Sequence, residues 1–155
     1  MADEIERKFK ISHLPHGIKR ESGVFIRQGY VCLNEDAELR VREKGNNYFL
    51  TFKSGEGLVR PEWEVGIPIW VFEGLWLSTR NARIYKRRYK IAGPDGLVFE
   101  IDVFEGQLRG LVILEVEFPT KEAADRFELP PEFNGIEVTE DDRYKNKHLA
   151  VFGRP

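Results

Sequence analysis

Like-charged side chains recur in pairs two residues apart along this sequence. The pairs are Glu4 and Glu6, Arg40 and Arg42, Glu62 and Glu64, Lys86 and Arg88, Glu100 and Asp102, and Glu115 and Glu117. Residues two apart point to the same face of a β-strand. Carboxylates are ligands that Mg²⁺ accepts, and Arg and Lys bind phosphate oxygens. The pairs could therefore hold a metal–polyphosphate complex if their strands turned these faces toward a common cavity.

Each charged pair lies in a segment where apolar and charged residues alternate, and this alternation predicts β-strands. In residues 4–11, for example, Ile5, Phe9 and Ile11 share one face, and the other face carries only charged side chains. We expect strands over residues 4–11, 24–33, 38–42, 48–53, 59–67, 84–91, 97–104 and 111–118. Short turns such as Gly45-Asn46-Asn47 join most of them, which predicts an antiparallel meander of about eight strands.

Three segments are predicted to be helical. Pro68 stands at a favourable first-turn position for a helix over residues 68–79, whose aromatic side chains we assign to packing against the sheet. A second, short helix over 121–127 is capped by Thr120. A third helix over 138–147 has acids in its first turn and bases in its last, and Thr139 with Asp142 resembles a capping box. The fold class is therefore mainly β (α+β), with a few covering helices.

The charged faces allow two interpretations of this sheet. In the ordinary one, the sheet buries its apolar face and leaves its charged face in water. In the other, the strands close into an eight-stranded antiparallel β-barrel, with apolar faces outward under the helices and charged faces lining an interior cavity. The like-charged pairs favour the second, because a surface selected only for solubility would intersperse the signs. Such a cavity would carry a large desolvation and repulsion cost without a ligand, so function explains these charges better than stability does.

The composition limits the classes of function. The chain has 155 residues, of which 32% are charged, and a formal net charge of −2, so it lacks the basic excess of a nucleic-acid-binding protein. No apolar run approaches the length of a membrane-spanning helix, and the acidic amino terminus does not resemble a signal peptide. A single cysteine, Cys32, excludes an internal disulfide and fits a reducing cytoplasm. We expect one cytoplasmic domain over residues 1–155.

Several motifs follow one another along the whole chain. They are Glu4-Ile5-Glu6-Arg7-Lys8, Arg27-Gln28-Gly29-Tyr30, Glu38-Leu39-Arg40-Val41-Arg42, Thr51-Phe52-Lys53-Ser54, Arg60-Pro61-Glu62-Trp63-Glu64, Lys86-Arg87-Arg88-Tyr89, Phe99-Glu100-Ile101-Asp102-Val103-Phe104, Leu114-Glu115-Val116-Glu117-Phe118, and Val138-Thr139-Glu140-Asp141-Asp142-Arg143-Tyr144-Lys145-Asn146. The first matches the Glu-x-Glu-x-Lys signature of the CYTH superfamily, the triphosphate tunnel metalloenzymes. In this order, the motifs resemble that superfamily throughout, and most of all its small single-domain bacterial members, several of which are inorganic tripolyphosphatases.

The resemblance implies an eight-stranded antiparallel tunnel that requires Mg²⁺ or Mn²⁺. It implies triphosphate binding by cationic side chains, which are Lys8, Arg40, Arg42, Lys53, Lys86 and Arg88. The first candidates for metal ligands are Glu4, Glu6 and Glu117, with Glu62, Glu64, Asp102 and Glu115 as nearby carboxylates. The catalytic candidates are Glu4, Glu6, Lys8, Tyr30 and Glu117. Tyr30 is expected either to pair with Lys8 and orient substrate or water, or to pack at the tunnel end. The carboxy-terminal helix is expected at a tunnel mouth.

The predicted reaction is metal-dependent hydrolysis of inorganic triphosphate to pyrophosphate and phosphate, with a carboxylate such as Glu6 or Glu117 accepting the proton of the attacking water. The alternatives within the superfamily are a nucleoside triphosphatase, a thiamine triphosphatase and a class IV adenylyl cyclase, which would share the triphosphate site. A non-catalytic polyphosphate-binding module is the alternative from another class. The expected partner is a small molecule, with no nucleic acid and no membrane, and we expect a monomer or a homodimer.

Overall fold

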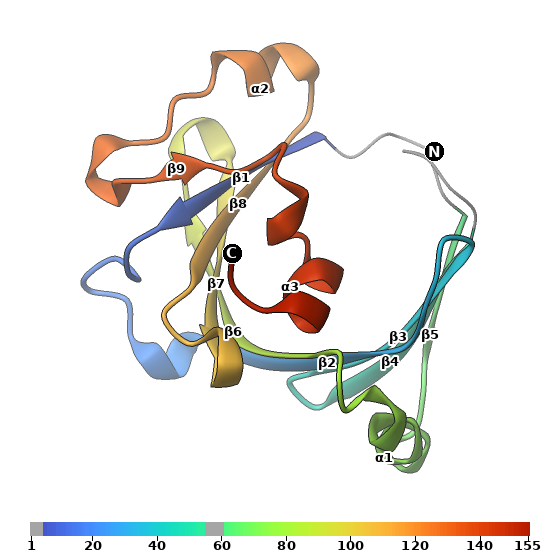
Figure 1. Ribbon diagram of the computed structural model, residues 1–155. Coiled ribbons are helices and arrows are strands. Elements are labelled where there is room, and N and C mark those ends of the chain that lie inside the picture. The colour runs from blue at the N-terminus through green and yellow to red at the C-terminus, as the bar shows by residue number, and fades with distance from the viewer. Residues whose placement is uncertain (1–4, 55–60) are drawn as a thin grey trace.

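The computed structural model describes residues 5–54 and 61–155. A nine-stranded sheet, antiparallel throughout, curves around a concave face (Figure 1). Its order is β5-β4-β3-β2-β6-β7-β8-β1-β9. The strands are β1 (Ile5–Ile11), β2 (Val24–Leu33), β3 (Ala37–Lys44), β4 (Asn47–Ser54), β5 (Glu62–Gly66), β6 (Arg83–Ala92), β7 (Val98–Glu105), β8 (Val112–Phe118) and β9 (Ile136–Glu137). The strands predicted from alternation are thus present with small shifts at their ends, except that residues 4, 59 and 60 of the predicted strands lie outside the described residues.

The expected closed eight-stranded barrel is wrong, because the sheet is open and has a ninth strand. Within the described part of the chain, β5 and β9 stand at opposite ends of the strand order and do not pair. The free edge of β1 is taken by the short strand β9, whose Ile136 lies opposite Lys10. The hydrogen bonding continues past β9, since Val138 donates its backbone N–H to the Lys8 carbonyl at 2.8 Å. β1 therefore pairs with β8 along one side, and on its other side Lys8, Phe9 and Lys10 are bonded to residues 136–139 and not to β5.

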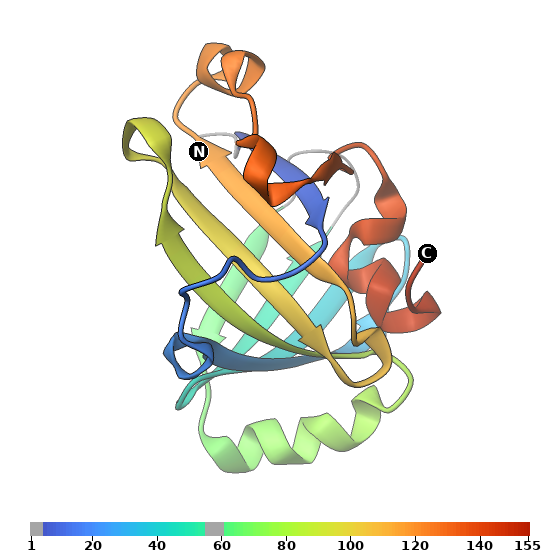
Figure 2. The ribbon, with the colours of Figure 1, turned by 90° about the vertical axis from the view of Figure 1, so that its left-hand side faces the viewer.

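Three α-helices accompany the sheet, namely α1 (Ile69–Trp76), α2 (Lys121–Arg126) and α3 (Asn146–Phe152). The first lies along the convex face (Figure 2), where Phe72 and Trp76 pack against Val41 of β3. The second begins at Thr120, whose hydroxyl accepts a hydrogen bond from the Ala123 N–H at 3.1 Å, so this predicted cap is confirmed. Among the described residues, no helix is long and apolar enough to cross a membrane.

The helix predicted over residues 138–147 is wrong for most of its length, because the α-helix of this region is α3, over Asn146–Phe152. Thr139 does not cap a helix, because its hydroxyl accepts a hydrogen bond from the backbone N–H of Lys8 at 3.0 Å and so extends the edge of β1. A short 3-10 turn over Asp142–Tyr144 follows, and α3 begins at Asn146. Leu149 of α3 packs with Ile84, Phe104 and Ile113, which share the concave face with the charged pairs. The C-terminal segment thus fills part of that face with an apolar cluster.

The side chain of Thr79 lies so close to Gly29 of β2 that a larger residue would not fit there. A Cβ atom added there would lie 2.6 Å from the side chain of Thr79. Thr79 cannot easily move, since its buried hydroxyl donates to the Trp76 carbonyl at 2.7 Å and accepts from Arg83 Nε at 2.9 Å. Replacing Gly29 by Ala should therefore destabilise the protein by roughly 1–3 kcal/mol, as overpacking does elsewhere. Urea unfolding of the variant would measure this, with Gly74→Ala as a control because a Cβ there meets nothing within 4 Å; equal stability of G29A and wild type would contradict it.

Candidate active site

The strand register brings the predicted charged residues to the concave face. Arg40 lies opposite Tyr30 on one side and Thr51 on the other, and Thr51 lies opposite Glu64. In the other half of the sheet, Arg88 lies opposite Asp102 and Glu115 lies opposite both Glu100 and Lys8. Directly opposed residues share a face of the sheet. The charged residues therefore share one face of an open sheet, and the apolar face packs against Phe72 and Trp76 of α1 and Ala124 of α2.

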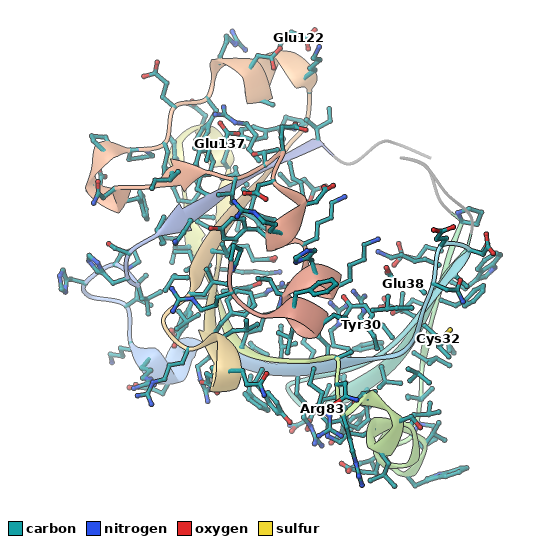
Figure 3. All side chains as sticks on the ribbon, in the orientation of Figure 1. Tyr30, Cys32, Glu38, Arg83, Glu122 and Glu137 are labelled. Atoms are coloured by element: carbon teal, nitrogen blue, oxygen red, sulfur yellow. The ribbon has the colours of Figure 1, made fainter. Side chains whose placement is uncertain are left out.

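A pocket of about 300 Å³ on this face, here called the cationic pocket, is lined by the predicted cations Lys8, Arg40 and Lys53, whereas Arg42, Lys86 and Arg88 do not line it. It is lined by Glu6, Lys8, Tyr30, Glu38, Arg40, Lys53, Glu115, Lys145, Asn146 and Lys147. Strands supply one wall and the start of α3 supplies another. Figure 3 shows Tyr30 and Glu38 on the concave side of the sheet, whereas Cys32 points away from it. The sequence did not predict Lys147 or Glu38 as site residues, although both lie in or next to motifs of the resemblance.

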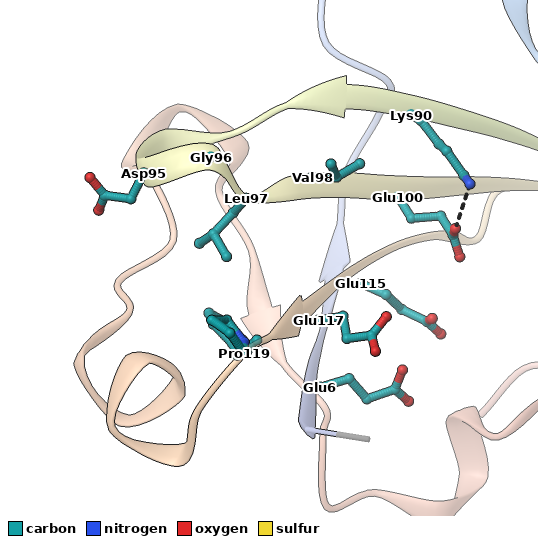
Figure 4. A pocket seen from close by; sticks show the side chains of 11 residues that line it. Glu6, Lys90, Asp95, Gly96, Leu97, Val98, Glu100, Glu115, Glu117 and Pro119 are labelled. Carbon is teal, nitrogen blue, oxygen red and sulfur yellow. Dashed lines mark ion pairs between the residues drawn. The ribbon is translucent and has the colours of Figure 1, made fainter. Parts of the chain in front are cut away.

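A second pocket, here called the acidic pocket, has a volume of about 610 Å³ and adjoins the first. Its carboxylates are those of Glu6, Asp95, Glu100, Glu115 and Glu117, and Lys90 also lines it. Figure 4 shows that four of these acids point to the same side, while Asp95 points away. Glu6 and Glu115 line both pockets. The two pockets therefore form one continuous surface that changes sign at these two carboxylates.

The acidic pocket offers the oxygen ligands that suit a divalent cation. Glu6 lies directly opposite Glu117, and Glu115 is two residues from Glu117 on the same face of β8. Among residues 5–54 and 61–155, however, no three His, Cys or acidic side chains are gathered as a metal site. Magnesium commonly takes only one or two protein carboxylates and completes its shell with phosphate oxygens and water, so the donor set fits this ion. Glu4, another predicted ligand, lies outside the described residues.

Asp102 lies apart from these acids, in a buried cluster with Lys86 and Arg88. Its carboxylate accepts two hydrogen bonds from Arg88, at 2.8 and 3.0 Å, and lies 2.9 Å from Lys86 Nζ. Burial acts to raise the pKa of Asp102, but the two cations outweigh it and lower the pKa to about 2. Burial lowers the pKa of Lys86, whose side chain is fully buried, and the Asp102 charge opposes this. Asp102 thus neutralises two predicted substrate-binding cations instead of joining the acidic pocket.

The arginines of β3 have buried N–H donors that are available to a ligand. Arg40 Nε and Arg42 Nε are buried and have no hydrogen-bond partner among the described residues. Arg42 makes one ion pair, from Nη2 to Glu64 Oε1 at 3.4 Å. Burial, together with the neighbouring charge of Arg40, lowers the pKa of Arg42. Two adjacent guanidinium groups with unused buried donors would gain both charge compensation and hydrogen bonds from a polyanion.

The remaining predicted residues lie at different places. Lys8 Nζ donates to the Tyr144 carbonyl at 3.3 Å and lies 3.5 Å from Glu115, whereas Tyr30 lies beside Arg40. Lys8 and Tyr30 both line the cationic pocket, so the expected pairing of Tyr30 with Lys8 stays a prediction. Glu62 and Glu64 belong to the edge strand β5, where Glu62 lies opposite Lys53. They face the concave side but line neither of the two pockets.

Fold and site together define a mainly β protein whose curved sheet carries adjoining cationic and acidic pockets on its inner face. The model of the CYTH domain matches residues 2–141, and the chain therefore belongs to the CYTH domain family. It is 48% identical to an inorganic triphosphatase of Nitrosomonas europaea, over 96% of this chain and 97% of that one. It is 37% identical to an inorganic triphosphatase of Acetivibrio thermocellus, over 97% and 94% of the two chains.

The fold is also that of a solved relative. The crystal structure of the inorganic triphosphatase NE1496 matches with a TM-score of 0.82 and 44% sequence identity, over 100% of this chain and 99% of that one. The likeness of both sequence and structure therefore extends over the strands that form the two pockets.

Proposed function

We propose that this protein hydrolyses inorganic triphosphate to pyrophosphate and phosphate, with Mg²⁺ or Mn²⁺ as its cofactor. The observation that carries the proposal is the junction of the cationic and acidic pockets at Glu6 and Glu115. A polyphosphate bound to a divalent cation needs both kinds of surface next to each other. Relatives that are 48% and 37% identical over nearly the whole chain carry the name inorganic triphosphatase, which supports the same reaction here.

The substrate is held by the cations of the concave face. Lys8, Arg40 and Lys53 line the cationic pocket, and Arg42 lies next to Arg40 on the same face of β3 with a buried Nε donor that has no partner among the described residues. Guanidinium groups bind phosphate oxygens through paired N–H donors, and the lysines act as point charges. We assign Lys86 and Arg88 to the same function, with Asp102 holding them in place until the substrate binds.

The metal would be held by Glu6 and Glu117, with Glu115 beside them, and Glu4, which lies outside the described residues, is kept as a further candidate ligand. When bound, a divalent cation neutralises phosphate charge and lowers the pKa of water so that hydroxide is available near neutral pH.

The chain's own residues position the reactants and move one proton. A water molecule attacks the terminal phosphorus, its oxygen forms the new P–O bond, and the bond to the bridging oxygen breaks to release pyrophosphate. Glu117 or Glu6 accepts the proton of that water, because these carboxylates lie at the surface of the acidic pocket next to the cationic one. Tyr30 is buried beside Arg40 and lines the pocket, and we assign it to orienting the substrate. Arginines in place on a rigid sheet stabilise the developing charge without rearrangement.

Phosphate release would test the proposal directly. The wild-type protein should release phosphate from inorganic triphosphate faster than from ATP or thiamine triphosphate, with Mg²⁺ or Mn²⁺, and should lose this activity when the metal is chelated. Faster release from an organic triphosphate would change the substrate while keeping the site. If none of the three substrates is hydrolysed while tripolyphosphate still raises the melting temperature, a class IV adenylyl cyclase and a binding module remain, and cyclic AMP formation from ATP distinguishes them.

A further inference from the structure

We propose that Gln28 is a positioning residue of the active site. When triphosphate is bound, the amide oxygen of Gln28 accepts a hydrogen bond from Arg42 Nε, and its amide nitrogen donates one to the Tyr30 hydroxyl. The inference rests on the proposed function and adds to it a residue that lines neither of the two pockets.

Gln28 lies in the floor of the concave face, at the boundary between two environments. On β3 it lies directly opposite Arg42, and on β6 it lies directly opposite Ile84. Ile84 packs with Leu149 of α3. The side chain of Gln28 is fully buried, so its amide is held between the arginines of the site and the apolar cluster of α3.

The amide of Gln28 is unsatisfied. Neither Oε1 nor Nε2 has a hydrogen-bond partner among residues 5–54 and 61–155. Buried polar groups are nearly always paired, and a buried amide without partners costs free energy that an apolar side chain of similar shape would not cost. Met or Leu would fill the same space better. The amide is therefore better explained by hydrogen bonds that form when a ligand binds.

The neighbours of Gln28 limit which hydrogen bonds these can be. The polar groups that face it are Tyr30 on its own strand, Arg42 directly opposite and, diagonally, Arg40 and Lys86. The three cations can only donate, so they require the amide oxygen, and Arg42 Nε is a buried donor without a partner among the described residues. The Tyr30 hydroxyl is the one acceptor of the four. Burial raises the pKa of the Tyr30 phenol, whereas Arg40 and, more weakly, the Gln28 amide lower it.

A bound phosphate would complete these hydrogen bonds. In the structure, Arg42 directs Nη2 to Glu64 at 3.4 Å. A phosphate that binds the terminal N–H groups of Arg42 replaces this ion pair and leaves Nε as the remaining donor of the planar guanidinium. A hydrogen bond from Nε to Gln28 then fixes the plane of the guanidinium toward the phosphate. The free-energy cost of the unpaired amide is recovered only in the complex.

Replacing Gln28 by Met separates a positioning role from a structural one, because it keeps the length of the side chain and removes both hydrogen-bonding atoms. The value of kcat/KM for tripolyphosphate should fall roughly 10- to 100-fold in Q28M, the range for a lost hydrogen bond to a charged group. The melting temperature without substrate should equal or exceed that of the wild type, because two buried unpaired polar atoms are removed. Gln107→Met is the matched control, since Gln107 is exposed and lines neither of the two site pockets, and it should change neither quantity.

A double-mutant cycle tests whether Gln28 acts through Arg42. Arg42→Lys keeps the positive charge and removes Nε. The dissociation constant of tripolyphosphate is measured by calorimetry with metal chelated, so that binding is observed without hydrolysis. Q28M should weaken binding roughly tenfold or more in the wild-type background and about threefold or less in R42K, where the main interaction is already absent.

Three results would overturn the proposal. A lower melting temperature of Q28M would assign Gln28 to the stability of the fold, and an unchanged kcat/KM in folded Q28M would remove it from the site. An equal loss of affinity in both backgrounds would show that it does not act through Arg42. If Q28M does not fold, Gln28→Leu serves for the same comparisons.

The proposed function can fail separately. If the wild type hydrolyses no triphosphate, the reaction is refuted, and the affinities of the double-mutant cycle alone decide the role of Gln28. A wild-type protein that does not bind tripolyphosphate would refute both.

Discussion

Replacing Glu117 by Gln should lower kcat for triphosphate hydrolysis by at least about 100-fold, the usual range for the loss of a general base or of a metal-ligand carboxylate. Glu117 lies opposite Glu6 and lines the acidic pocket. The substitution keeps the volume of the side chain and removes the charge that would accept a proton or hold a cation. The measurement is steady-state phosphate release with Mg²⁺ at saturating triphosphate, and the same variant should bind tripolyphosphate through the intact cations of β3.

The fold should survive this change. Glu117 is exposed and its neighbours on the same face are other acids, so the neutral variant loses no buried partner and relieves repulsion. Its melting temperature should equal or exceed that of the wild type. Glu122→Gln on α2 is the control for a surface charge away from both pockets, and it should be fully active. A kcat of E117Q within about threefold of the wild-type value would remove Glu117 from the mechanism.

Replacing Asp102 by Asn should have the largest effect on stability. Lys86 is fully buried and lies 2.9 Å from Asp102, and the Arg88 guanidinium donates two hydrogen bonds to the same carboxylate. Removing one member of a buried ion pair commonly costs roughly 3–5 kcal/mol because the other charge stays buried and uncompensated. The free energy of unfolding from urea titration measures this loss. Asp125→Asn, an exposed change of the same kind on α2, should be close to neutral, and a D102N variant as stable as D125N would refute the argument.

The ion pair between Asp102 and Lys86 also predicts how the stability of the protein depends on pH. The pKa of Asp102 is about 2 in the folded protein against an ordinary value of 3.8. The unfolded chain therefore takes up this proton first as the pH falls, and the stabilisation by the carboxylate is complete above the ordinary pKa and declines as the pH approaches the folded value. The stability difference between wild type and D102N should be fully present at about pH 5 and shrink between about pH 4 and pH 2. A stability difference between wild type and D102N that does not depend on pH would show that the ionised Asp102 carboxylate is not the source of the stabilisation.

The sequence predicted the faces of the strands better than their closure. The alternation of Arg40, Arg42 and their neighbours follows from a property of each strand alone, so the concave face could be found without knowing which strands pair. Whether the sheet closes depends on which segment takes the free edge of β1. That segment, Ile136–Glu137, is too short to show a period, and its role depends on contacts far along the chain.

The candidate site could also be predicted only in part, because it depends on both local patterns and long-range contacts. Site residues on strands, such as Glu6 and Glu115, could be assigned to the charged face from the sequence, because alternate residues of a strand share a face. The pairing of Asp102 with Lys86 could not be deduced in this way, because both face inward and only the register sets which acid meets which cation. Lys147 belongs to a helix whose start was misassigned, since Thr139 satisfies the backbone of Lys8 instead of capping a helix. The local sequence pattern thus predicted which side chains face the site. The pairing of acidic with basic side chains depends on contacts between distant parts of the chain.

The pairing of β1 also constrains how the protein can be made. Glu6 and Lys8 leave the ribosome first, but β1 finds its partners only in β8 and β9, within residues 112–137. Contacts so distant in sequence form late, because closing the long intervening chain costs entropy before the contact contributes any stabilisation. A nascent chain that ends before β8 can pair β2 with β6 and β6 with β7 but cannot bring Glu6 to Glu117. The junction of the two pockets therefore forms only after β8 has been synthesised, and a product truncated before β8 lacks Glu115 and Glu117 as well as Lys145 and Lys147 of the cationic pocket.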